Sequence, residues 1–318
     1  MKHAAASFFF SLGVGVCAVP LLVTVLVRFR AGQHVAAYGP ESHRVKEGTP
    51  TMGGILFVVL VIASWVAFDR SRAGFVAAFA LAAGAAIGLL DDVINARQGR
   101  DLGLSVRHKL ALQAGVGVLV GIGLLAINAT HQKFPGLGAP SLGWGIVVVA
   151  ALAVVACTNA VNLTDGVDGL AGTCCAIAIA ALGIIALRQH NVPVEVIGFA
   201  TCGALVAFLL ANWHPARLFM GDTGSLGLGA VLVALSAEVG MLWLLPLLGI
   251  VFVAETLSVI INVTAIRRYQ RRIFRASPIH HHFEEMGLRE ERLVMAFGGI
   301  AVVAGVLTIL VAGGAVPQ

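Results

Sequence analysis

Residues 144–187 read WGIVVVAALAVVACTNAVNLTDGVDGLAGTCCAIAIAALGIIAL, two long apolar runs joined by a short polar stretch. A helix needs about 20 apolar residues to cross the hydrocarbon core of a bilayer. The runs 144–161 and 170–187 both approach that length, and neither contains a charged residue. The stretch between them carries two aspartates and an asparagine. These residues predict two membrane-spanning helices with polar side chains in the loop that joins them.

The composition of the whole chain extends this prediction. Of its 318 residues, 58% are hydrophobic and 12% are charged, and the mean hydropathy is +0.93. Soluble domains are about 45–50% apolar and about 25% charged, and disordered chains are poor in apolar residues, so both classes are excluded. The net charge of +5 is not taken as a sign of nucleic-acid binding, and no nucleic-acid partner is expected.

Ten uncharged or nearly uncharged runs follow one another along the chain. They lie at about 4–27, 52–68, 74–90, 110–130, 144–161, 170–187, 193–211, 223–237, 241–262 and 293–313. Ten spans use about 200 residues, which leaves too few for a separate soluble domain. We therefore predict an all-α membrane protein, a polytopic bundle of about ten transmembrane helices that forms one domain over residues 1–318. The first run is long enough to span, and no clear signal-peptide cleavage site follows it.

The charged residues predict an orientation. The loops after the odd-numbered runs hold 16 of the 21 Lys and Arg residues and 12 of the 16 Asp and Glu residues; they are 28–51, 91–109, 162–169, 212–222 and 263–292. Basic residues mark the cytoplasmic side of membrane proteins. Both termini are therefore expected outside, with the polar chemistry on the cytoplasmic face, where nucleotides are found.

Three aspartates in these loops are candidates for cation binding. Asp91 and Asp92 close the third run, and Asp222 lies in the turn FMGDTGS at residues 219–225. A carboxylate at the end of a membrane helix needs water, a cation or a partner, and adjacent carboxylates repel each other. Mg²⁺, which prefers oxygen ligands, would relieve both costs. The alternative for the Asp pair is a solvated helix end. Backbone N–H groups of a turn that opens a helix can also cradle phosphate.

Asn162, Asp165 and Asp168 are spaced by three in NAVNLTDGVDG and would share one face if this segment were helical. A calcium loop is rejected because the ligand spacing and the closing Glu of the EF-hand are missing. An ordinary turn with Asx capping is the alternative.

Two further polar segments lie on the same predicted face. KEGTPTMGG at residues 46–54 offers a basic side chain and hydroxyls to phosphate, or is simply a basic flank. SPIHHHFE contains His280, His281 and His282, which cannot all bind one metal from a regular helix. Imidazoles can instead bind diphosphate or carry protons. Together the five segments suit metal-assisted transfer of a phosphorylated group from a nucleotide.

Six segments of the chain, taken in order, resemble the bacterial phospho-N-acetylmuramoyl-pentapeptide transferases (translocase I). They are GTPTMGG, the Asp pair, NAVNLTDGVDGLAG, FMGDTGSLGLG, AETLSV and RIFRASPIHHHFE. This family lies within the polyprenyl-phosphate N-acetylhexosamine-1-phosphate transferase superfamily. The resemblance covers residues from about 44 to about 295. It implies that UDP-N-acetylmuramoyl-pentapeptide gives its phospho-sugar to undecaprenyl phosphate, which yields lipid I and UMP and requires Mg²⁺. It also implies a multi-pass protein of the bacterial inner membrane, in contact with membrane lipids and resembling bundle enzymes that form homodimers.

The resemblance also implies residue roles. Asp91, Asp92 and Asp222 match the family's catalytic aspartates, and Asp222 matches its Mg²⁺ ligand. The positions that match substrate-binding residues are Lys46, Thr51, Lys109, Asn162, Asp165, Asp168, Asn212, Phe219, His280, His281 and His282. One position departs from the pattern: the family usually reads DDxxK, and Asn95 stands where that lysine would be. A phosphate-binding cation is missing there, and Arg97 is not an equivalent donor.

Two other functions remain open at this point. One is a sister transferase that uses UDP-N-acetylglucosamine. The other is a lipid or solute transporter. The distribution of acidic residues argues against a transporter, because they gather on one predicted face and Glu255 alone lies well inside a span. Sequence also leaves open whether the lipid phosphate attacks directly, which we favour, or an aspartate first forms a covalent phospho-sugar intermediate.

Overall fold

The computed structural model describes residues 1–28, 48–98, 103–134 and 138–314. These residues form helices and loops, with two isolated β-bridges and no strand among them. The helices are α1 (Lys2–Arg28), α3 (Ile55–Phe68), α4 (Arg72–Gln98), α5 (Val106–Ala126), α6 (Gly145–Thr164), α7 (Leu170–Gln189), α8 (Val192–Asn212), α9 (Gly221–Glu238), η1 (Leu242–Leu244), α10 (Leu245–Leu248), α11 (Ile250–Tyr269), α12 (Ile279–Glu285) and α13 (Glu290–Gly314).

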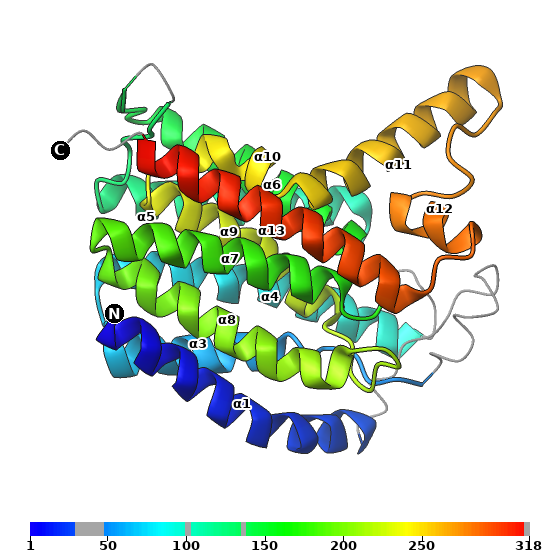
Figure 1. The fold of residues 1–318 in the computed structure, drawn as a ribbon, viewed down its shortest axis with the longest axis horizontal. Helices are drawn as coiled ribbons and strands as arrows, with labels where there is room; N and C mark the ends of the chain where they lie inside the picture. The colour runs from blue at the N-terminus through cyan, green and yellow to red at the C-terminus, as the bar shows by residue number, and fades with distance from the viewer. Residues whose placement is uncertain (29–47, 99–102, 135–137, 315–318) are drawn as a thin grey trace.

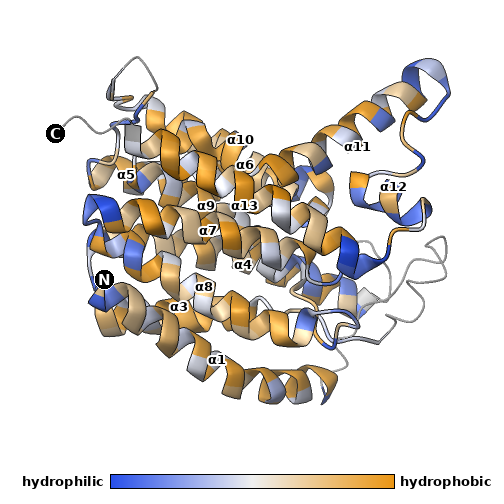
Figure 2. Ribbon diagram, viewed as in Figure 1, coloured by the Kyte–Doolittle hydropathy of each residue, from blue (hydrophilic) through white to orange (hydrophobic). Residues whose placement is uncertain are grey.

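The all-α membrane bundle predicted from the sequence is confirmed. Within the described ranges, the ten helices of 14 residues or more correspond one to one with the ten predicted apolar runs. Eight of them are long and apolar enough to cross a membrane. α3 is shorter, with 14 residues, and α9 has an acidic residue near each end. Figure 2 shows apolar residues along the middle of the bundle and hydrophilic residues gathered toward its ends.

α9 is the central helix of the bundle. All of its residues from Thr223 to Ala237 are buried, and α4, α6 and α3 pack against it. Glycines allow the close approach, as is common between membrane helices. A Cβ atom on Gly54 of the loop before α3 would overlap the backbone of Gly224, and one on Gly88 of α4 would overlap the backbone of Asp222. The start of α9 is therefore fixed by backbone-to-backbone packing.

The outer helices expose apolar side chains. In α1, α5 and α6 less than a third of the most apolar window is buried, compared with 78% in α8. Leu21 of α1, Leu119 of α5 and Leu152 of α6 are more than half exposed. Such side chains suit contact with lipid tails, as expected for an integral membrane protein.

Both ends of the described chain lie at the same end of the bundle. α1 begins and α13 ends at the left of Figure 1, whereas α12 and the loops after α6 and α8 lie at the right. The described parts of the polar loops predicted to share one face therefore lie at one end of the bundle, opposite the start of α1 and the end of α13. α11 projects away from the bundle toward that end, and α12 follows it beside the start of α13.

Candidate functional site

The two adjacent aspartates lie within α4, which continues to Gln98 beyond the apolar run. Asp91 and Asp92 are 5% and 7% exposed. Because successive side chains on a helix point about 100° apart, the two carboxylates face different neighbours. They consequently take part in different contacts.

Asp92 is bound to the first turn of α9. Its Oδ1 accepts a hydrogen bond from the backbone N–H of Asp222 at 3.1 Å. Its Oδ2 accepts from the backbone N–H of Thr223 at 3.0 Å and from the Thr223 hydroxyl at 2.6 Å. The first N–H groups of a helix have no partner within the helix, and a carboxylate there also interacts favourably with the helix dipole. Asp92 thus acts as a cap from a second helix and fixes the start of α9.

Asp222 faces a cation and an amide. Its Oδ1 accepts a hydrogen bond from Asn162 Nδ2 at 2.6 Å, and its Oδ2 pairs with the Lys109 ammonium. The same amide nitrogen donates to Ser225 Oγ at 3.0 Å. Lys109 Nζ also lies 3.7 Å from Asp91 Oδ2. Lys109 is therefore placed between two carboxylates that come from different helices.

Asp91 borders a pocket at this end of the bundle. Its Oδ1 accepts from the backbone N–H of Leu104 at 2.7 Å, and its Oδ2 accepts from Asn95 Nδ2 at 3.2 Å. The pocket has a volume of about 300 Å³, and its walls include both polar and apolar side chains. Its lining residues are Asp91, Asn95, Gly103, Leu104, Val106, Lys109, Leu110 and Asn159. Val106 is 73% exposed on the outside of the bundle.

Thr51 and Phe219 lie beside this cluster. The segment before α3 runs along the segment before α9: the Phe219 N–H donates to the Pro50 carbonyl, and the Gly53 N–H donates to the Phe219 carbonyl, both at 2.9 Å. Gly221 has a φ of +68°, and a Cβ atom there would lie 2.6 Å from Thr51 Oγ1. Lys46, the other predicted residue of this segment, lies outside the described residues.

The expected shared face of Asn162, Asp165 and Asp168 is not formed. α6 ends at Thr164 with Asp165 as its C-cap, so Asp168 lies beyond the helix and its side chain has a different environment. Asn162 turns toward Asp222, as described above. Asp168 instead joins a second group at the same end of the bundle.

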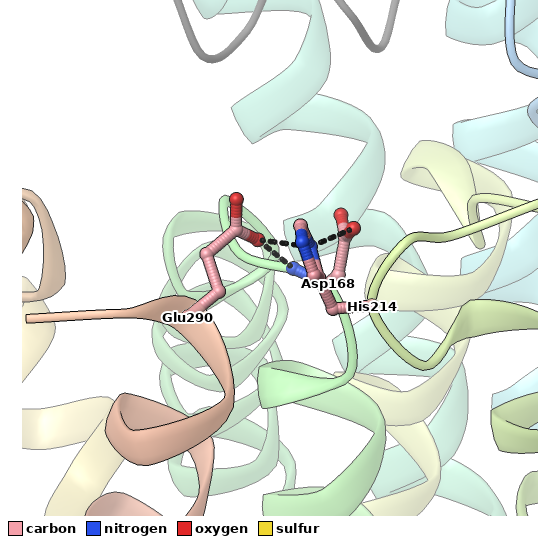
Figure 3. A group of neighbouring side chains, drawn as sticks. All are labelled: Asp168, His214 and Glu290. Atoms are coloured by element: carbon pink, nitrogen blue, oxygen red, sulfur yellow. Dashed lines mark hydrogen bonds and ion pairs between the residues drawn. The ribbon is translucent and has the colours of Figure 1, made fainter.

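This second group consists of Asp168, His214 and Glu290 (Figure 3). A 3.0 Å hydrogen bond joins His214 Nδ1 to Asp168 Oδ2, and Glu290 Oε2 lies 3.6 Å from the same nitrogen. The Asp168 N–H donates to Glu290 Oε2 at 3.2 Å. Sequence reasoning missed His214 and Glu290, because a lone histidine and one acid in a charged stretch gave no signal.

Asn212 holds two loops together through backbone groups. Its Oδ1 accepts from the Gly169 N–H at 3.0 Å, and its Nδ2 donates to the Leu218 carbonyl at 2.9 Å. It is 2% exposed. These contacts give Asn212 a structural position between the loop after α6 and the loop after α8, while its predicted role in substrate binding stays a prediction.

The three histidines of α12 have three different environments. His280 is fully buried, with Nδ1 3.1 Å from Glu255 Oε2, and the backbone N–H of His280 donates to the same oxygen at 3.3 Å. His281 Nδ1 lies 2.6 Å from Glu284 Oε2. His282 Nδ1 accepts from the Arg275 N–H at 3.2 Å. The three imidazoles therefore contact three different partners. Glu255, the single acid predicted deep in a span, is thus the partner of His280.

The structure therefore brings Asp91, Asp92, Asp222, Lys109 and Asn162 into one connected cluster. The three carboxylates come from two helices, and the basic group lies on a third. Two carboxylates that approach one ammonium make a centre suited to a cation. The cluster has an open pocket on one side and the bundle core on the other.

Comparisons with known proteins agree on one family. Residues 73–240 match Glycosyl transferase family 4, and residues 46–58 match the phospho-N-acetylmuramoyl-pentapeptide-transferase signature 1. The chain is 40% identical to the phospho-N-acetylmuramoyl-pentapeptide-transferase of Listeria welshimeri, over 94% of each chain. It is 42% identical to the protein of that name from Moorella thermoacetica, over 89% of this chain and 91% of the relative. For the Bacillus velezensis relative the identity is 37%, over 94% of both.

Proposed function

Since this chain belongs to the phospho-N-acetylmuramoyl-pentapeptide-transferase family, we propose that it transfers phospho-N-acetylmuramoyl-pentapeptide from UDP-N-acetylmuramoyl-pentapeptide to undecaprenyl phosphate. The products are lipid I, a precursor of peptidoglycan, and UMP. The observation that carries this proposal is the cluster of Asp91, Asp222 and Lys109 at one end of an apolar bundle. A water-soluble nucleotide and a lipid headgroup can both reach such a place.

The reaction joins two anionic phosphates, so the site must reduce their repulsion. An oxygen of the lipid phosphate attacks the phosphorus atom attached to the sugar. The bond from that phosphorus to the bridging oxygen breaks, and UMP leaves with this oxygen. Lys109, held between two carboxylates, is placed to contact the phosphates and offset their charge.

The donor set suits Mg²⁺, which prefers oxygen ligands. Asp222 would hold the ion, because its carboxylate already faces the positive charge of Lys109. When bound, the ion would neutralise the donor diphosphate and stabilise the departing UMP. Asp92 is better placed to hold the start of α9, since its two oxygens accept three hydrogen bonds from Asp222 and Thr223.

Asp91 is the best placed general base. It borders the pocket, and one wall of this pocket is formed by apolar residues of α5. A lipid phosphate bound there would have its chain toward the membrane and its oxygens toward Asp91. The second pKa of a phosphate monoester is about 6, so the nucleophile is largely ionised near neutral pH and needs little activation. We therefore favour direct attack over a covalent aspartyl intermediate.

The loops that carry the site hold most of the basic residues, which supports placing the site on the cytoplasmic face of the bacterial inner membrane. UDP-linked sugars are made on that side. This orientation also places both termini outside. The nucleotide-sugar substrate and the lipid carrier would thus approach from the cytoplasm and from the inner leaflet.

The test is release of UMP by the purified protein in detergent with undecaprenyl phosphate. We expect release with UDP-N-acetylmuramoyl-pentapeptide and Mg²⁺, and a loss of release on chelation of Mg²⁺. Release with UDP-N-acetylglucosamine alone would point to the sister transferase instead. Because detergent leaves no sealed compartment, a pure transporter would release no UMP from either donor. Release that survives chelation would contradict the metal assignment.

A further inference from the structure

A fully buried pair of side chains joins α11 to α12. The side chains of Glu255 and His280 are both 0% exposed, and Glu255 Oε2 lies 3.1 Å from His280 Nδ1. The same oxygen accepts a hydrogen bond from the backbone N–H of His280 at 3.3 Å. Within the described part of the chain, no Lys or Arg nitrogen lies within 4.0 Å of the Glu255 carboxylate. A carboxylate inside a membrane span is costly unless it has a partner, so Glu255 depends on His280.

The opposite edge of the imidazole faces the loop after α6. A Cβ atom on Gly166 would overlap His280 Nε2 and would lie 3.0 Å from His280 Cε1. Gly166 does not have a positive φ, so its backbone conformation does not require a glycine. The imidazole does require one, because a side chain on Gly166 would push the loop away from α12. His280 therefore fills the space between α11 and this loop.

The loop that His280 contacts leads directly to the aspartate cluster. It begins at Asp165, the C-cap of α6, and Asn162, three residues earlier, donates a hydrogen bond to Asp222 at 2.6 Å. α12 has only seven residues, and isolated helices shorter than about 12 residues are marginally stable. The position of α12 therefore depends on its contacts with the bundle, and His280 sets its spacing from the loop.

We propose that His280 is a positioning residue of the transferase, held by Glu255 on one side and by Gly166 on the other. The imidazole keeps α12 and the loop after α6 at one spacing, and these two segments form part of the surface that binds the sugar-nucleotide donor. This inference rests on the proposed function, because it explains how that surface is kept in order. Glu255 then affects donor affinity through His280, although it is buried away from the donor.

The first test is a double-mutant cycle on donor binding. Calorimetry in detergent with Mg²⁺ measures the affinity for UDP-N-acetylmuramoyl-pentapeptide without the lipid acceptor, so no turnover is needed. Glu255→Gln should weaken binding by at least about tenfold in the native background, because residues in contact are coupled. With His280→Asn already present it should weaken binding by less than about threefold, since a neutral amide can hydrogen bond to a glutamine as well as to a glutamate.

The matched control for this cycle is Glu195→Gln. Glu195 is a buried glutamate of α8 that pairs with the N-terminal amine, and its replacement should leave donor affinity unchanged. Equal weakening by Glu255→Gln in the two backgrounds would overturn the proposal. A native protein that does not bind the donor would contradict the proposed function instead.

The second test is a size rescue, measured by thermal unfolding without any ligand. Gly166→Ala should lower the unfolding temperature by at least about 3 °C, because the new methyl group overlaps the imidazole. Adding His280→Asn should restore the unfolding temperature to that of His280→Asn alone, because the shorter side chain leaves room for the methyl group. If Gly166→Ala does not fold, the double variant should still fold.

Gly183→Ala is the matched control for the size rescue. Its added Cβ atom would lie 2.9 Å from the ring of Phe199, and His280→Asn should not restore its stability. Failure of His280→Asn to restore Gly166→Ala would overturn the contact on which the proposal rests. Because this readout needs neither donor nor turnover, it tests the His280 contact whether or not the transferase reaction is found.

Discussion

The replacement Asp92→Asn tests whether this carboxylate positions Asp222 or takes part in the chemistry. An asparagine has one oxygen and one NH₂ group, so it can accept from only one of the two N–H groups at the start of α9. The other N–H, of Asp222 or Thr223, would face a second donor. Losing a hydrogen bond to a charged group costs about 1.5–3 kcal/mol. We expect the free energy of unfolding to fall by that amount.

If the start of α9 shifts, Asp222 loses its alignment with Asn162 and Lys109. If the activation free energy rises by the same amount because Asp222 must be realigned, kcat falls by about tenfold to hundredfold, since each 1.4 kcal/mol is a factor of ten. A positioning role leaves the shape of the pH–rate profile unchanged. A general base would instead account for one limb of that profile.

The assay measures UMP release from about pH 5.5 to about pH 9, the range in which shifted carboxylates and histidines titrate, together with thermal unfolding. Asp91→Asn is the matched control, since Asp91 borders the pocket and accepts from Leu104 and Asn95, whereas Asp92 accepts from the start of α9. We expect Asp91→Asn to change the pH profile and Asp92→Asn to change the unfolding temperature. An Asp92→Asn protein with native stability and an altered pH profile would refute the reasoning.

Three further changes have defined outcomes. Asp222→Asn should abolish UMP release while circular dichroism and unfolding temperature stay near those of the native protein; native activity with Mg²⁺ would remove Asp222 from the metal centre. Asn95→Lys should retain UMP release, because a lysine would still pair with Asp91. It should also lower the KM for the donor, because it adds a phosphate-binding cation to the pocket wall. An inactive variant would mean that the site differs from the family pattern. Gly221→Ala should lower the free energy of unfolding by about 1–3 kcal/mol, because φ is +68° and the added Cβ lies 2.5 Å from Asp92 Oδ2; unchanged unfolding would contradict the close packing.

The membrane bundle could be predicted because the bilayer sets the length and composition of a span. The ten apolar runs could be located without knowing which helices are neighbours in the bundle. The helix ends were harder to place. α4 continues past the apolar run to Gln98. α9 begins at Gly221, where Asp92 of α4 accepts hydrogen bonds from its first N–H groups.

The candidate site was predicted in part. The aspartate cluster followed from the shared loop face and from the family pattern. The partners of these residues did not, because the contacts join positions far apart in the chain. Asp168 pairs with His214 across 46 positions, and His280 pairs with Glu255 across 25. Local spacing carries no information about such pairs.

The different positions of Asp91 and Asp92 follow from helix geometry and from small residues. Neighbours on a helix point about 100° apart, so the two carboxylates cannot make the same contacts, and Asp92 alone accepts from the first backbone N–H groups of α9. Reaching α9 also requires that α4 and α9 approach closely, which Gly88 permits. A methyl group at Gly88 would meet the backbone of Asp222 and push the helix away. The distance between the two helices, and with it the role of each aspartate, therefore depends on Gly88.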